Sequence, residues 1–243
     1  MLPAPFRTLR SLAVVVCLTA ASACGSGLLG TEYEYEEELR LYVDGAARID
    51  VHSSVAALVA LRGVALEVDP EAEIGRESVR ALFEGPGVEV TSLRLSRRDG
   101  RRFVHVRLAV EDIRLLSRLA PFSWSTYQFG RRNDLLEFKQ VVGSSAAKKV
   151  GDVGWDGNEV VAFRLHAPSV VAFHNAPSKR IERGNILEWE QPLTDRLTGV
   201  PITVQVNMEP DSILYSTLLL FASMVLLAAV TFGLVIWRVA RHG

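Results

Sequence analysis

The stretch VEVTSLRLSRRDGRRFVHVRLAV, residues 88–110, decides the fold. Apolar and polar residues alternate over Val88–Leu95 and again over Phe103–Val110, which is the pattern of two half-buried β-strands. Between them, Arg98-Asp99-Gly100 supplies residues that suit a tight turn, so the stretch predicts an antiparallel hairpin. A chain with this central segment is expected to contain an antiparallel sheet.

Similar patterns lie on both sides of this hairpin. Glu36–Val43 and Ala47–His52 alternate around Asp44-Gly45, and they predict a hairpin near the start of the domain. A third hairpin and four further strands are expected at Ser123–Phe129 with Leu135–Val142, Glu159–His166, Val170–His174, Asn185–Glu190 and Pro201–Met208.

Helical segments separate the hairpins. Ser53–Arg62 opens on serines and closes at a glycine, Ile74–Glu84 is stopped by Gly85-Pro86-Gly87, and Glu111–Leu119 places its apolar residues mostly on one side. Gly143–Asn158 is rich in small residues and is expected to be a long loop. This order predicts an α+β fold, in which antiparallel β-hairpins form one curved sheet or partial barrel with two or three helices on one face.

Residues 1–23 have the features of a signal peptide. Two arginines provide a charged start, Ser11–Ala20 is an apolar run too short to span a bilayer, and Ala21-Ser22-Ala23 supplies the small residues of a cleavage site. Cys24 follows directly, in an arrangement that resembles a bacterial lipobox, so Cys24 is the expected lipidation site. The alternative is ordinary export cleavage, which would leave a free thiol at the new N-terminus.

The segment Ile213–Trp237 contains 25 consecutive residues without a charge. As a helix it would be ~37 Å long, which is enough to cross a hydrocarbon core of ~30 Å with some tilt. The tail 238–243 is basic, and positive flanks stay on the cytoplasmic side. We therefore expect a single-pass protein of the cytoplasmic membrane with its domain on the extracytoplasmic side and its C-terminus in the cytoplasm.

These signals predict the layout of the whole chain. Residues 24–35 would form the lipidated cysteine and an acidic tether that stays solvated, and residues 36–209 would form one extracytoplasmic domain. Pro210 and Asp211 leave almost no linker between that domain and the uncharged segment. Both ends of the domain would then be attached to one bilayer, and the domain would lie close to its surface.

The sequence shows no catalytic constellation. No G-x-S-x-G, P-loop or G-x-G-x-x-G motif occurs, and the two cysteines lie near the N-terminus. His166 with His174 could form a metal pair and Glu188 with Glu190 could act as paired carboxylates, but a solvated surface is the preferred interpretation of both. We expect a protein that is not an enzyme, with no catalytic residue, metal site or cofactor.

Clustered arginines are the strongest local signal. Residues 94–132 contain ten arginines and only three acidic residues. Guanidinium groups suit phosphate, and each basic group near an anionic membrane contributes ~1 kcal/mol. The functional hypothesis is contact with anionic lipid headgroups or an anionic glycolipid, and the alternative is a solvated face paired with carboxylates elsewhere. Two predicted turns carry the candidate contact residues: Arg97, Arg98, Arg101, Arg102, Arg131 and Arg132.

Other partners can be considered from the same features. Nucleic acid is not expected as a partner outside the cell. Ala229 and Gly233 are small residues spaced i, i+4 in the uncharged segment, which is a weak signal for homodimerisation through that helix.

The layout resembles the LppM-like family of bacterial envelope lipoproteins. The residues that carry the resemblance are Ala21–Cys24, the hairpin around Asp44-Gly45, the stretch Asn185–Trp189 before Pro192-Leu193, and the span 213–237. The resemblance implies a non-enzymatic domain that binds lipid or glycolipid, and no family site residues can be assigned.

Three functional hypotheses follow. The first is a membrane-anchored envelope lipoprotein whose domain binds lipid, glycolipid or a protein partner at the membrane surface. The second is an accessory subunit of an inner-membrane protein complex that works through the span 213–237. The third, which the absence of a catalytic constellation disfavours, is an envelope hydrolase.

Overall fold

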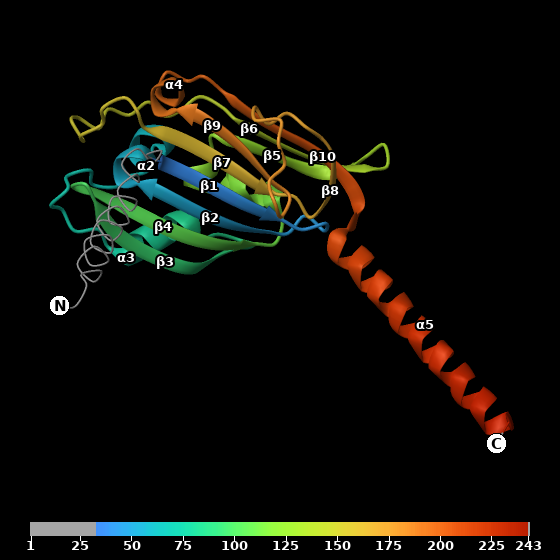
Figure 1. Cartoon of the computed structure of the whole chain (residues 1–243). Coiled ribbons are helices and arrows are strands. Elements are labelled where there is room, and N and C mark those ends of the chain that lie inside the picture. The colour runs from blue at the N-terminus through green and yellow to red at the C-terminus, as the bar shows by residue number, and fades with distance from the viewer. Residues whose placement is uncertain (1–32, 243) are drawn as a thin grey trace, which may run out of the picture. The chain divides into compact units, whose positions relative to one another are not determined.

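The computed structural model describes residues 33–242. The predicted signal peptide, the predicted lipidation site Cys24 and most of the predicted tether lie outside the described residues. Within them, ten strands form two sheets, which Figure 1 shows with the larger sheet toward the viewer.

The larger sheet has six strands in the order β3-β4-β2-β1-β7-β9. Neighbouring strands pair antiparallel except β1 and β7, which are parallel. The strand bounds are β1 Tyr33–Leu41, β2 Ala47–Ser54, β3 Val88–Arg98, β4 Arg101–Val110, β7 Val160–His166 and β9 Ile186–Pro192.

The smaller sheet has four antiparallel strands in the order β5-β6-β10-β8. Its inner face packs against the larger sheet, because Tyr127 and Gln140 both bond to Glu37 of β1. The strand bounds are β5 Ser125–Arg132, β6 Leu135–Val142, β8 Ser169–His174 and β10 Ile202–Ser212.

One short helix is buried against the larger sheet. All eight residues of α2 (Val55–Arg62) are buried, and the helix contacts β1, β2 and β4 of the larger sheet as well as α4 and η3. Ser54 caps its start by accepting a hydrogen bond from the Ala57 amide at 3.0 Å, and Gly63 ends it with φ +68°. The remaining helices are α3 Arg76–Phe83, η2 Ile113–Arg118, η3 Ala120–Phe122, α4 Leu193–Leu197 and α5 Ile213–His242.

The α+β class and the predicted hairpins are confirmed, with three corrections. The strands form two sheets rather than one curved sheet or partial barrel, because β5, β6, β8 and β10 pair with one another and not with the six strands of the larger sheet. The parallel β1–β7 pair was not expected. The predicted helix 111–119 is a 3₁₀ segment, η2, followed by a second 3₁₀ turn that contains Pro121.

The start of the domain also differs from the expectation. Residues 33–35, assigned to a solvated tether, are the first residues of β1. Glu34 and Glu37 are 0% and 2% exposed, so the acidic run is not solvated throughout. Burial of these carboxylates is possible because Arg101 and Arg62 lie beside them, at 3.5 Å in each case.

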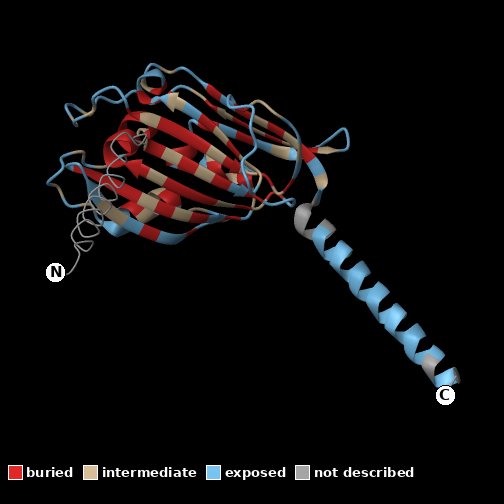
Figure 2. Cartoon of the chain, viewed as in Figure 1, coloured by how far each residue is buried: buried red, intermediate tan, exposed pale blue. Residues whose placement is uncertain are grey.

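Helix α5 follows β10 without an intervening residue. Its segment Thr217–Arg238 is long and apolar enough to cross a membrane, and none of it is buried against the rest of the protein. Figure 2 shows the contrast between this exposed helix and the buried strands. A fully exposed apolar helix is consistent with a membrane anchor.

Candidate functional site

Strand pairing defines two opposite ends of the domain. We call the end at which β10 passes into α5 the α5 end, and the opposite end the far end. The β5–β6 turn lies at the α5 end, because Arg131 pairs with Leu136 and Leu136 pairs with Met208 near the end of β10. The β1–β2 turn lies near the α5 end, because Arg40 pairs with His166 and the chain then reaches Ser169, the partner of Ser212. The β3–β4 turn lies at the far end, because β4 runs from that turn to Val110, which pairs with Ala47 beside the β1–β2 turn.

The six candidate arginines therefore do not form one surface. Arg97, Arg98, Arg101 and Arg102 lie at the far end, and only Arg131 and Arg132 lie at the α5 end. The sequence could not show this, because the order of strands in the sheets decides which turns are neighbours.

Two of the far-end arginines are buried rather than available to a ligand. Arg101 is 8% exposed and its Nη1 donates to the Gly154 carbonyl at 3.3 Å. Its guanidinium also lies 3.5 Å from Glu34 and 3.9 Å from Glu159. This arginine therefore neutralises two buried carboxylates and attaches the loop before β7 to the sheet.

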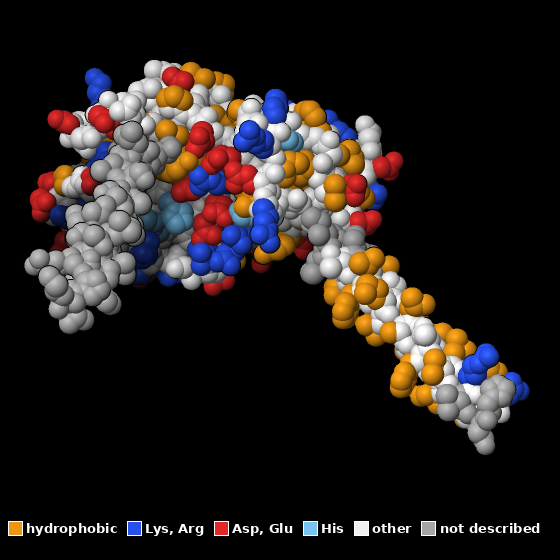
Figure 3. Space-filling model, in the orientation of Figure 1, with side chains coloured by type: hydrophobic (Ala, Val, Ile, Leu, Met, Phe, Trp, Pro, Cys, Tyr) orange, Lys and Arg blue, Asp and Glu red, His pale blue; other side chains and the backbone are white. Residues whose placement is uncertain are grey.

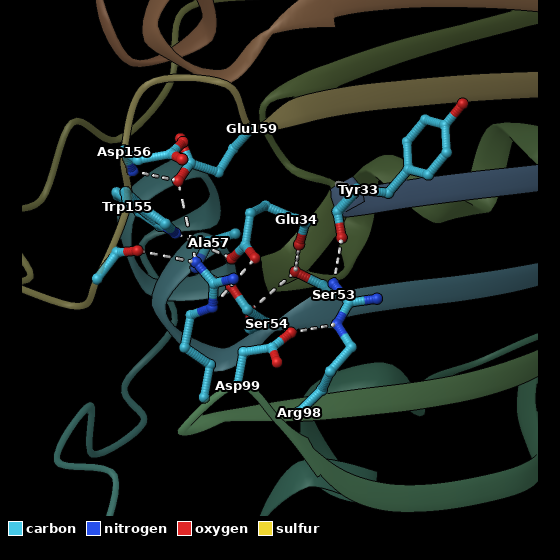
Figure 4. A network of polar contacts seen from close by, with 12 residues as sticks. Tyr33, Glu34, Ser53, Ser54, Ala57, Arg98, Asp99, Trp155, Asp156 and Glu159 are labelled. Carbon is cyan, nitrogen blue, oxygen red and sulfur yellow. Dashed lines mark hydrogen bonds and ion pairs between the residues drawn. The ribbon is translucent and has the colours of Figure 1, made fainter. Parts of the chain in front are cut away.

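Figure 4 shows this network around Glu34 and Glu159. Trp155 donates from Nε1 to Glu34 at 2.9 Å, and Glu159 accepts from the amides of Asp156 and Gly157 at 2.6 and 2.9 Å. Burial raises the pKa of Glu34 above its ordinary value, while hydrogen bonds from Ser54 and Trp155 oppose that rise. The network connects β1, β4 and the loop before β7.

Arg102 is likewise 8% exposed and bonds to backbone carbonyls of the segment between α2 and α3, at Glu67 and Ala72. Arg97 and Arg98 are exposed, but each contacts another group of the domain. Arg97 bonds to the Pro70 carbonyl at 2.7 Å, and the Arg98 guanidinium lies 4.5 Å from the centre of the Phe103 ring. The expectation of an exposed basic tip is therefore wrong for Arg101 and Arg102.

At the α5 end, Arg131 and Arg132 are exposed at the tip of the β5–β6 hairpin. The Arg132 side chain is 72% exposed and its nearest acidic partner, Glu137, is 3.7 Å away. Such a loose, solvent-exposed ion pair contributes little and leaves the guanidinium available to another anion.

Three further segments reach the same end. The β1–β2 turn does so because Arg40 pairs with His166, the last residue of β7. The β7–β8 turn does so because Ser169 pairs with Ser212. The loop between β8 and β9 returns there, since the Asn185 amide group donates to the Ser169 carbonyl at 2.9 Å. Glu182 of this loop lies at the α5 end, because it bridges to Ile186, the partner of His166. The loop also contains the basic residues Lys179, Arg180 and Arg183.

The other candidates from the sequence do not form sites. His166 and His174 lie on different sheets, so no metal pair forms between them. Glu188 contacts Arg164, and Glu190 bonds to the Tyr33 hydroxyl, as members of a charged outer face of the larger sheet. Figure 3 shows acidic, basic and histidine side chains mixed on this face. Among residues 33–242, no group of three or more histidine, cysteine or acidic residues is placed to hold a metal ion.

Sequence reasoning did not identify a histidine pair on the same face. His52 and His105 are cross-strand partners, with their Nδ1 atoms 2.8 Å apart, and His105 also contacts the Ser96 hydroxyl at 2.7 Å. Burial, with His52, Arg94 and Arg98 nearby, lowers the pKa of His105 to about 4. The alternation of the two strands could have placed both rings on one face, but not opposite each other.

Comparison with known proteins adds little to this geometry. No protein-family description and no curated protein sequence matches the chain. The structure is similar to the folded domain of the Mycobacterium tuberculosis protein LppM, determined by NMR, with 12% sequence identity and a TM-score of 0.41. The similarity covers 78% of this chain and 98% of the LppM domain.

Proposed function

We propose that the domain is a lipid-surface module, anchored by α5, whose α5 end binds anionic headgroups through Arg131 and Arg132. The observation that supports this most directly is the pairing of Arg131 with Leu136 and of Leu136 with Met208, four residues before β10 ends. The hairpin tip thus lies at the end of the sheet from which the apolar helix continues. Exposed guanidinium groups at that position face the layer in which phosphates lie.

The four arginines of the far end are not part of the proposed headgroup contact. Arg97, Arg98, Arg101 and Arg102 lie at the other end of the strands and bond to the domain itself. The proposal therefore predicts different effects from two arginines that looked equivalent in the sequence, Arg97 and Arg131.

The test is hydrogen–deuterium exchange on the full chain reconstituted in nanodiscs. Amides of the β5–β6 turn should exchange more slowly when the nanodisc contains anionic lipid than when it is zwitterionic. Reversal of Arg131 to Glu should reduce that protection at least fivefold, because the loss of one basic group alone corresponds to ~1 kcal/mol. Reversal of the exposed Arg97 to Glu is the matched control and should leave it unchanged. Equal effects of the two reversals, or protection that ignores lipid charge, would refute headgroup binding at this tip.

A further inference from the structure

We infer that the α5 end also carries a rim of apolar side chains that enters the membrane interface, so that the occupant of this surface is the bilayer itself. This inference deepens the proposed function, on which its choice of membrane-facing end rests. It concerns a different interaction, however, because burial of apolar side chains does not depend on lipid charge.

The rim consists of exposed side chains that a soluble domain would be expected to bury. Outside α5, the described residues include seven large exposed hydrophobic side chains. Four of them belong to the segments that meet at the α5 end. Trp124 and Val200 lie just before β5 and β10, toward the far end, and Phe173 pairs with Asn207 in the middle of β10. The four are Tyr42, Val43, Val170 and Ile181. Single exposed apolar residues are ordinary, but a group gathered at one end marks an interaction surface.

Strand register places this rim beside the start of α5. Val170 is adjacent in sequence to Ser169, which pairs with Ser212. With ordinary strand and helix spacings, the backbone path from Val170 through Ser212 to Thr217 is about 16 Å long. Thr217 begins the segment that is apolar enough to span the membrane. This upper bound holds for any direction of α5, so Val170 cannot lie far from the headgroup layer.

The other residues of the rim also lie in segments that reach the α5 end. Tyr42 and Val43 follow Arg40 and Leu41 in the β1–β2 turn, and Arg40 pairs with His166. Ile181 precedes Glu182, which bridges to Ile186, and Ile186 also pairs with His166. Three separate turns and loops therefore present apolar side chains at one end of the domain.

The chemistry of the rim suits a bilayer better than a protein groove. Its apolar side chains, 38% to 51% exposed, alternate with charged residues of both signs, including Arg180, Glu182 and Arg183. Tyrosine is favoured at the membrane interface, where its ring is shielded and its hydroxyl stays hydrated. The charged neighbours can remain among the headgroups while the short apolar side chains reach below them.

The experiment uses a photo-crosslinking amino acid, p-benzoylphenylalanine, placed singly in the full chain at Val170 or Tyr42 and illuminated in nanodiscs. Trp124 and Val200 are matched control positions, since they are 39% and 46% exposed. We expect lipid adducts at Val170 and Tyr42 to exceed those at the controls at least fivefold, in zwitterionic and anionic nanodiscs alike. An unchanged thermal unfolding midpoint confirms that each variant is folded.

The two proposals fail differently. If Arg131→Glu does not change the protection of the β5–β6 turn amides but lipid adducts persist at Val170, the apolar rim is supported and headgroup binding by Arg131 is refuted. Equal lipid labelling at Val170 and Val200 would overturn the rim. Adducts at Val170 to a second copy of the chain, or to a co-purified membrane protein, in place of lipid would overturn it as well.

Discussion

Ser169 of β8 pairs with Ser212, the last residue of β10 before α5 begins. This pairing connects the edge of the smaller sheet to the start of the apolar helix, and in the proposed function this end of the domain is next to the membrane. The lipid-surface function, the choice among the six arginines and the apolar rim all depend on it.

The buried ion pair of Arg62 and Glu37 predicts a large stability effect. The guanidinium lies 3.5 Å from the carboxylate, which also accepts hydrogen bonds from Tyr35, Tyr127 and Gln140 at 2.9, 3.1 and 2.8 Å. Replacing Arg62 by Met would leave a buried carboxylate without its cation. We expect the free energy of unfolding of the full chain in detergent, measured by denaturant titration, to fall by about 3–5 kcal/mol.

An exposed ion pair provides the control for that prediction. Arg40 and Glu38 are 3.2 Å apart, but the Arg40 side chain is half exposed. Arg40→Met should therefore cost less than about 1 kcal/mol. If Arg62→Met and Arg40→Met lower the free energy of unfolding by similar amounts, the buried pair does not contribute more to stability than the exposed one.

The lowered pKa of His105 predicts a pH dependence. Its folded pKa of about 4 lies below the ordinary value of 6.5, so between these pH values the unfolded chain binds more protons than the folded one. The contribution of His105 to stability is fully present above pH 6.5 and is lost as the pH falls toward 4. Replacing His105 by Gln should make the denaturation midpoint depend less on pH between about 4 and 6.5. A variant whose midpoint falls with decreasing pH as steeply as that of the wild type would contradict the lowered pKa of His105.

The buried arginine at the far end predicts a local effect on one loop. Arg101 bonds to the Gly154 carbonyl and lies 3.9 Å from Glu159. Arg101→Leu should accelerate proteolysis within residues 143–159, because the loop loses its attachment to β4. Arg97→Leu, which removes an exposed arginine from the same hairpin, should not. Equal cleavage rates in the two variants would argue against the structural role of Arg101.

The sequence predicted features that depend on neighbouring residues. Asp44-Gly45 and Arg98-Asp99-Gly100 correctly indicated hairpin turns, and Gly45 and Asp99 have φ values of +92° and +49°. The serines before α2 correctly indicated its start, where Ser54 is the cap. These turn and cap signals depend only on neighbouring residues, so they do not require knowledge of how distant segments pair.

Features that depend on distant residues could not be predicted. The parallel pairing of β1 with β7 joins segments more than 100 residues apart, and nothing in either segment specifies it. The run of glutamates at residues 34–38 looked solvated, because the arginines that allow Glu34 and Glu37 to be buried are far away in sequence. For the same reason, the arginine cluster could be detected but not divided into its far-end and α5-end members.

The central claim is that the α5 end faces the bilayer, and quenching of a fluorescent amino acid by lipids with spin-labelled headgroups tests it most directly. The probe is placed in the full chain in nanodiscs either at Gly130, where a side chain would meet open space, or at the exposed Arg97. We predict strong quenching at position 130 and little at position 97. Equal quenching at both positions, or stronger quenching at position 97, would contradict the proposed orientation.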